Sequence, residues 1–131
     1  MSIKECLLKT DNFVDNIYLD KYCDLIRLNK STGRINFKTQ RHHIVPKFVF
    51  KCLNIPVDNS KTNLVNLLYV DHCLAHYYLA LCSKTLEAKH YNFISIRHIL
   101  GSKSLNIEMS EKEFIEHLPY YQELYENTGT H

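Results

Sequence analysis

The chain has 131 residues, a formal net charge of +2 and five cysteines, none of which stand in a C-x-x-C pair. This length fits one domain, residues 1–131, that can bury a core without disulfide bonds, and the cysteine pattern excludes a secreted disulfide scaffold and a cysteine zinc ribbon. No apolar stretch approaches the roughly 20 residues of a membrane span, and the first residues lack the apolar run of a signal peptide. We therefore expect a soluble, cytoplasmic protein that makes no contact with a membrane.

Helical and strand periodicities alternate along the first half of the chain. Apolar side chains recur every three or four positions over residues 11–29, and this spacing predicts an N-terminal helix that Thr10 or Asp11 can cap. Residues 34–45 alternate in part between apolar and polar side chains, which predicts a strand that ends before a proline. Residues 54–63 have the composition of a loop.

The second half of the chain is mainly helical in its pattern. Residues 64–69 form a short apolar run that predicts a second strand, and residues 70–82 carry the clearest helical spacing in the middle of the chain. A further helix is predicted over residues 86–100, where a glycine follows. The capping box at 110–113 predicts a last helix over 111–127. This order of elements indicates an α+β fold.

Histidines gather on two of these elements. His42 and His43 stand near the end of the first strand, and His72 and His76 stand on the helix after the second strand. Two helical side chains four positions apart share a face and can bind the same metal ion. Neighbouring strand side chains point to opposite faces, so one histidine of the pair can bind metal while the other acts as a base. A cation held by His42, His72 and His76 would keep open positions, with His43 free to take a proton from an attacking water.

Charge is segregated along the sequence. Between Leu25 and Val57 there are seven basic residues and no Asp or Glu, whereas after Leu105 six acidic residues stand against one lysine. A basic run is either a solvated face or a surface that attracts nucleic-acid phosphates. The basic residues for which we predict contacts with nucleic acid are Arg41, Lys47, Lys38 and Lys51.

The histidines and one asparagine resemble the motif of a known family. His42-His43-Ile-Val-Pro46, then Asn63-Leu-Val, then His72-x-x-x-His76 looks like the HNH endonuclease motif, especially that of small phage-type members. The resemblance implies a ββα-metal core over about residues 34–82, with a small two-stranded antiparallel sheet embedded in flanking helices. It also implies an enzyme, a metal-dependent endonuclease that hydrolyses DNA phosphodiester bonds.

The resemblance assigns a role to each motif residue. In the family the first histidine of the pair and the helix histidines bind the metal, the second histidine is the general base, and the asparagine orients that base through its side-chain carbonyl. Carried over, these roles fall on His42 with His72 and His76, on His43, and on Asn63. Asn66 competes for the amide role, but Asn63 lies nine residues before His72, as in the family. An all-imidazole set favours Zn²⁺, Ni²⁺ or Mn²⁺ over Mg²⁺, and the choice among these four ions stays open.

Two other functions remain compatible with the sequence. A non-catalytic nucleic-acid-binding module would use the histidines to hold a structural metal, and an interaction domain would use the acidic C-terminal helix. Because a single HNH centre cuts one strand, cleavage of a duplex would require a homodimer or two successive nicks. The histidines for which we predict no role are His90, His98, His117 and His131.

Overall fold

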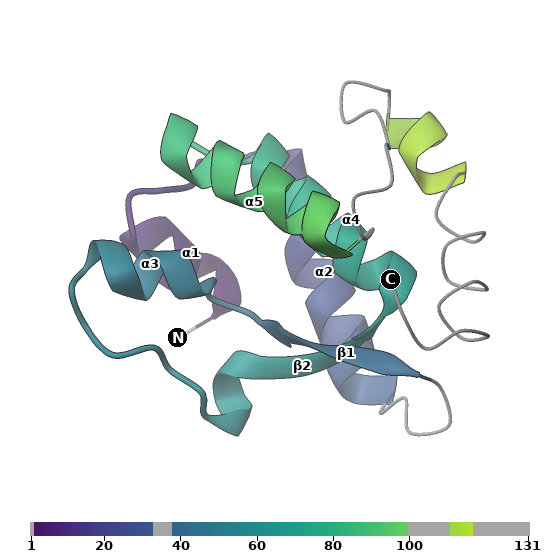
Figure 1. Cartoon of the computed structure of the whole chain (residues 1–131), viewed down its shortest axis with the longest axis horizontal. Coiled ribbons are helices and arrows are strands. Elements are labelled where there is room, and N and C mark those ends of the chain that lie inside the picture. The colour runs from purple at the N-terminus through teal and green to yellow at the C-terminus, as the bar shows by residue number, and fades with distance from the viewer. Residues whose placement is uncertain (1, 33–37, 100–110, 117–131) are drawn as a thin grey trace.

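The computed structural model describes residues 2–32, 38–99 and 111–116 (Figure 1). Its elements are α1 (Ile3–Lys9), α2 (Ile17–Thr32), β1 (Thr39–His43), α3 (Lys47–Cys52), the 3-10 turn η1 (Lys61–Asn63), β2 (Leu64–Leu68), α4 (Tyr69–Leu81) and α5 (Leu86–Ile99). The fold is mixed α+β, as the sequence predicts. Within the described ranges, no helix combines the length and the apolar character that crossing a membrane requires.

The two strands form a small antiparallel sheet that leads straight into a helix. The register pairs His42 with Val65 and His43 with Leu64. One further hydrogen bond extends the ladder, from the Ile44 N–H to the Asn63 carbonyl at 2.9 Å. β2 ends at Leu68 and α4 begins at the next residue, so the helix folds back against both strands. This arrangement brings the end of β1 close to the first turns of α4.

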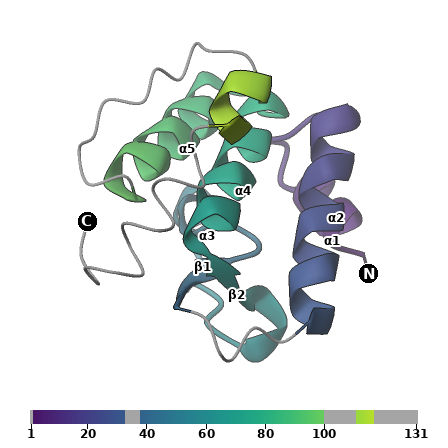
Figure 2. The same cartoon turned by 90° about the vertical axis from the view of Figure 1, so that its right-hand side faces the viewer.

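α4 is the central helix of the molecule. Figure 2 shows it between α2 and α5, and both of these helices pack against it. The sequence predicts an apolar stripe on one side of α4, with His72, His76 and Leu79 on another. In the structure the second side is also covered, because α5 packs there: Leu79 has no exposed surface and His76 is 6% exposed. A helix that is buried nearly all round needs its polar side chains paired, and His76 therefore needs a partner.

The N-terminal helix begins later than its spacing predicts. Residues 17–29 are helical as predicted, but the predicted start at residue 11 is wrong, because residues 10–16 form a turn between α2 and the unpredicted helix α1. Asp11 has a φ of 60°, a left-handed conformation that an α-helix does not contain. The cap is Asn16 rather than Thr10 or Asp11, since its Oδ1 accepts hydrogen bonds from two N–H groups of the first turn at 2.9 and 3.2 Å.

The remaining elements lie close to their predicted places. β2, α4 and α5 each match within one residue at either end. Of the predicted strand over 34–45, residues 34–37 lie outside the described part of the chain, and β1 covers 39–43 of the remainder. α3 has no counterpart among the predicted elements. Residues 111–116 are helical, as expected, and the rest of the predicted last helix lies outside the described residues.

Candidate metal centre

Three imidazoles meet between β1 and α4. His42 comes from β1, and His72 and His76 come from successive turns of α4. One potential ligand nitrogen from each ring lies within 4.8 Å of the other two, and the ring centroids are 5.0 to 5.2 Å apart. A group of this size can hold one metal ion. The structure therefore brings together the three residues that the sequence predicts as ligands, which we call the histidine triad.

His42 is oriented by a tyrosine of α2. The Tyr22 hydroxyl donates to the Ile44 carbonyl at 2.7 Å and lies 2.8 Å from His42 Nε2. Because the single hydroxyl proton goes to the carbonyl, the tyrosine oxygen accepts from His42 Nε2–H. The lone pair of His42 is therefore on Nδ1.

The two histidines of α4 are oriented by side-chain amides. His72 Nδ1 lies 2.8 Å from Gln40 Oε1, and His76 Nδ1 lies 2.8 Å from Asn92 Oδ1. The Asn92 amide has a defined orientation, because its Nδ2 donates to the Ala88 carbonyl at 2.8 Å. Each amide oxygen accepts an N–H, which leaves the lone pair of each ring on Nε2.

These three hydrogen bonds prepare the rings for a metal. Ligand histidines commonly donate their second N–H to an oxygen acceptor, which fixes the tautomer and the ring orientation. Here every ring has such an acceptor and one remaining lone pair. The sequence predicts the ligands but not the acceptors Tyr22, Gln40 and Asn92, because these come from α2, β1 and α5 and no local spacing links them to the histidines.

Burial keeps the triad uncharged. Burial is the largest cause that places the pKa of His42 well below its ordinary range, and the other histidines add to it. The pKa of His72 is also well below its ordinary range, through burial and then through His76. Burial lowers the pKa of His76 to about 4, although its hydrogen bond to Asn92 opposes the change. Since a metal binds only the neutral imidazole, the triad is ready to bind a cation at neutral pH.

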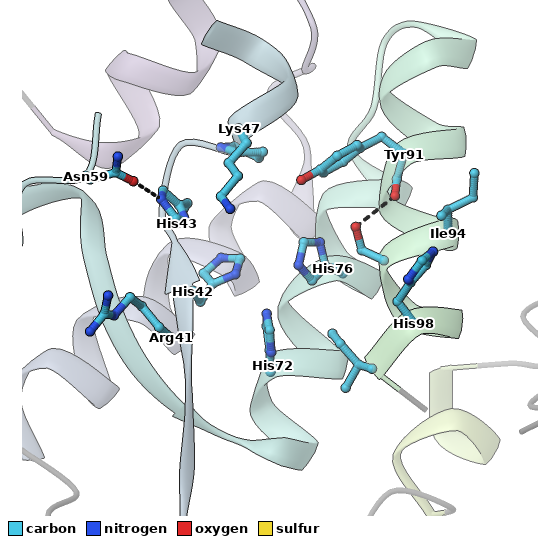
Figure 3. Close-up of a pocket in the computed structure, with 13 residues that line it drawn as sticks. Arg41, His42, His43, Lys47, Asn59, His72, His76, Tyr91, Ile94 and His98 are labelled. Atoms are coloured by element: carbon cyan, nitrogen blue, oxygen red, sulfur yellow. Dashed lines mark hydrogen bonds between the residues drawn. The ribbon is translucent and has the colours of Figure 1, made fainter. Parts of the chain in front are cut away.

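The triad opens into a cleft of about 610 Å³ (Figure 3). One wall comes from β1, the start of α3 and the loop before η1, and the other comes from α5. None of the described residues that line the cleft is an Asp or a Glu, whereas Arg41 and Lys47 both line it. A cleft with this charge attracts an anion.

His43 lies on the β1 wall, outside the triad. Its Nε2 is 2.8 Å from Asn59 Oδ1, in the loop that precedes η1 (Figure 3). With the amide oxygen as acceptor, His43 donates Nε2–H and keeps the lone pair on Nδ1. Asn59 is therefore a site residue that the sequence analysis missed, because it lies sixteen residues from His43 in a loop without a motif.

The side chain of Asn63 bonds to backbone groups near His43, and its expected role in orienting the base stays a prediction. Its side-chain carbonyl accepts from the Val45 N–H at 2.8 Å. Its Nδ2 donates to the carbonyls of Val45 at 3.3 Å and Asp58 at 2.9 Å. Asn63 thus ties the backbone after His43 to the loop that carries Asn59, so any orienting effect on the imidazole is indirect.

The four basic residues predicted to contact nucleic acid divide into two groups. Arg41 and Lys47 line the cleft, whereas Lys38 and Lys51 are exposed and do not line it. Asn66, the competitor for the amide role, is exposed on β2 and is also outside the cleft.

α5 contributes more to the cleft than the sequence suggests. His98, for which the sequence predicts no role, lines the cleft together with Tyr91, Ile94, Ser95 and Ile99. No periodicity distinguishes these residues from an ordinary helix surface. His90, on the same helix, is exposed and does not line the cleft.

No protein-family model, curated protein or solved structure matches the chain. The residues of the cleft and their geometry are therefore the basis on which a function can be proposed.

Proposed function

We propose that the protein is a metal-dependent endonuclease of the HNH type, which hydrolyses phosphodiester bonds of DNA, with β1, β2 and α4 as a ββα-metal core. One observation carries the proposal: three neutral imidazoles, each oriented by its own acceptor, converge in a basic cleft beside a fourth imidazole, His43. Phosphodiester hydrolysis needs a base for the attacking water and positive charge around the phosphate.

The triad fits a divalent cation in a catalytic role. Three protein ligands leave coordination positions open, whereas structural zinc sites are closed by four. When bound, the cation would neutralise charge on the phosphate and on the leaving 3′ oxygen. An all-nitrogen donor set favours Zn²⁺, Ni²⁺ or Mn²⁺ over Mg²⁺.

His43 is the general base in this proposal. Asn59 holds its Nε2–H, so Nδ1 is the atom that accepts the proton from water. A base works only when it is held within hydrogen-bond reach of the proton that it removes. Asn59 supplies that orientation, and Asn63 fixes the distance between the two segments that carry Asn59 and His43.

Arg41 and Lys47 attract the substrate. Both line the cleft, where a phosphate backbone can approach the triad. Lys38 and Lys51 lie beyond the cleft lining and would contact phosphates further along the strand. The substrate in this proposal is DNA, and a second copy of the chain is needed only if both strands are cut in one encounter.

The test is incubation of the purified protein with supercoiled plasmid in the presence of Mg²⁺, Mn²⁺, Ni²⁺ or Zn²⁺. We expect nicked circles with at least one of the transition metals, and loss of nicking when His76→Ala removes a ligand. His90→Ala is the matched control, because it removes an exposed imidazole outside the cleft and should nick like the parent.

The same experiment separates the proposal from a non-catalytic module with a structural metal. That module would nick no plasmid with any ion and would unfold when a chelator removes the metal. Circular dichroism before and after chelation, run beside the nicking assay, distinguishes the two functions.

A further inference from the structure

α5 forms the wall of the cleft that the HNH resemblance does not explain. It lies outside the two strands and the helix that carry the motif, yet five of its residues line the cleft. It is also tied to the triad, since Asn92 of α5 accepts a hydrogen bond from His76. A side chain on this wall therefore has a defined position relative to the triad.

Tyr91 is an α5 side chain of the cleft lining that packs against two other rings. Its ring packs against Phe48 of α3, with 4.5 Å between the centroids, and lies 6.4 Å from the His76 ring. The ring is half-buried, whereas the hydroxyl points into the cleft, over the imidazoles of the triad (Figure 3). Phe48 packs against the ring, and the hydroxyl faces the cleft beside the Ser95 side chain, where a ligand can reach it.

The chemistry of that hydroxyl suits a phosphate group. A tyrosine keeps its proton at neutral pH, since its ordinary pKa is about 10, and so offers a hydrogen-bond donor. Lys47 points into the cleft from the opposite wall and supplies a charged donor (Figure 3). The non-bridging oxygens of a phosphodiester are acceptors only, so donors on two sides match the two oxygens.

We propose that the Tyr91 hydroxyl donates a hydrogen bond to a non-bridging oxygen of the phosphodiester in this cleft, with Lys47 contacting the phosphate from the other wall. This inference rests on the proposed function and adds a substrate contact outside the motif. Tyr91 then acts twice: its ring supports His76 and its hydroxyl binds the substrate.

The test is Tyr91→Phe, which keeps the ring and its packing and removes only the hydroxyl. Two quantities are measured on the metal-loaded protein: the dissociation constant of inorganic phosphate by calorimetry, and the initial rate of plasmid nicking. A hydrogen bond to a charged group predicts about tenfold weaker phosphate binding and an about 10- to 100-fold slower cut, with unchanged metal affinity. Tyr18→Phe is the matched control, because Tyr18 lies on α2, packs against Tyr78 and does not line the cleft.

Each outcome has a distinct meaning. If Tyr91→Phe binds phosphate and nicks like the parent, the contact does not exist, and this is also the result expected if Tyr91 only stacks on a base. If the parent never nicks but binds phosphate in a Tyr91-dependent way, the endonuclease proposal fails while the anion contact stands. If the metal-loaded parent neither binds phosphate nor nicks, both proposals fail.

Discussion

The two walls of the cleft differ in how they are encoded. The β1 wall carries His42 and His43, which stand next to each other in the sequence and carry the resemblance to the HNH motif. The α5 wall carries Tyr91 and His98, which belong to no motif and reach the cleft only because α5 packs against α4. The adjacent histidines are thus visible in the sequence, whereas the residues that orient the imidazoles come from a strand, a loop and two helices, and α5 shapes the cleft.

Removing the base should produce the largest effect on the motif side. We expect His43→Ala to slow nicking by about 10²- to 10⁴-fold, the range for losing a general base, without changing metal affinity. Plasmid nicking at saturating metal and calorimetric metal titration measure the two quantities. Equal rates for parent and variant would show that His43 is not the general base, and the base would then have to be sought among the residues of the α5 wall.

The stability of the metal-free protein should depend on pH through the buried triad. The unfolded chain binds protons near the ordinary histidine pKa, whereas burial lowers the pKa of His76 to about 4 in the folded protein. The stabilisation by the neutral ring is therefore complete above about pH 6.5 and is lost as the pH falls from there toward 4, on the order of 3 kcal/mol for this one site.

Denaturant unfolding of the chelated protein at pH 7.5 and pH 5 measures about 2 kcal/mol of this loss. Asn92→Ala removes the α5 partner of His76 and should destabilise the protein at both values, since it leaves a buried N–H unpaired. A stability that does not change between the two pH values would mean that the triad is not buried as described.

The residues that accept hydrogen bonds from the triad sharpen the comparison between the two walls, because none of them is a histidine of the motif. We expect Gln40→Ala to weaken metal binding about 10- to 100-fold, since it removes the acceptor for His72 Nδ1–H. Asn66→Ala is the matched control, an exposed amide on the neighbouring strand. Isothermal titration with Zn²⁺ measures both variants, and equal affinities would show that the rings need no outer partner.

Asn59 tests whether the base needs its own positioning residue. Asn59→Ala should slow nicking about tenfold, because the imidazole loses a hydrogen bond worth about 1 to 1.5 kcal/mol. Asn59→Asp keeps an acceptor oxygen at the same place and should recover most of the rate. A purely structural role for Asn59 predicts no recovery by the carboxylate, and this result would point to Asn63 alone as the residue that holds the loop.

Replacing single lysines inside and outside the cleft lining should have the smallest effect, and we expect it on the salt dependence of DNA binding. Lys47→Ala should lower the slope of log affinity for DNA against log salt by about one, whereas Lys51→Ala should change it less, because Lys51 lies outside the lining. Fluorescence anisotropy with a labelled duplex at several salt concentrations measures both slopes. The reverse order would place the DNA beside the C-terminal end of α3 rather than in the cleft.

The sequence predicts the α+β class, β2, α4, α5 and the three triad residues because each depends on local spacing. His72 and His76 share a helix face because they are four residues apart. His42 is predicted from its place beside His43 near the end of a strand. Asn59 and Asn92 could not be predicted in this way, since their roles arise from a loop and a helix that tertiary packing brings to the histidines. The same reason explains the missed start of α2, where residues 12–14 bond to the backbone of residues 82–84 instead of continuing a helix.

The most direct test of the central claim is X-ray absorption spectroscopy of the protein loaded with one equivalent of Zn²⁺. We expect one bound ion with three imidazole nitrogens at about 2.0 to 2.1 Å and at least one further oxygen that does not come from the protein. Substoichiometric binding, or a shell closed by four protein ligands, would contradict an open catalytic site at His42, His72 and His76.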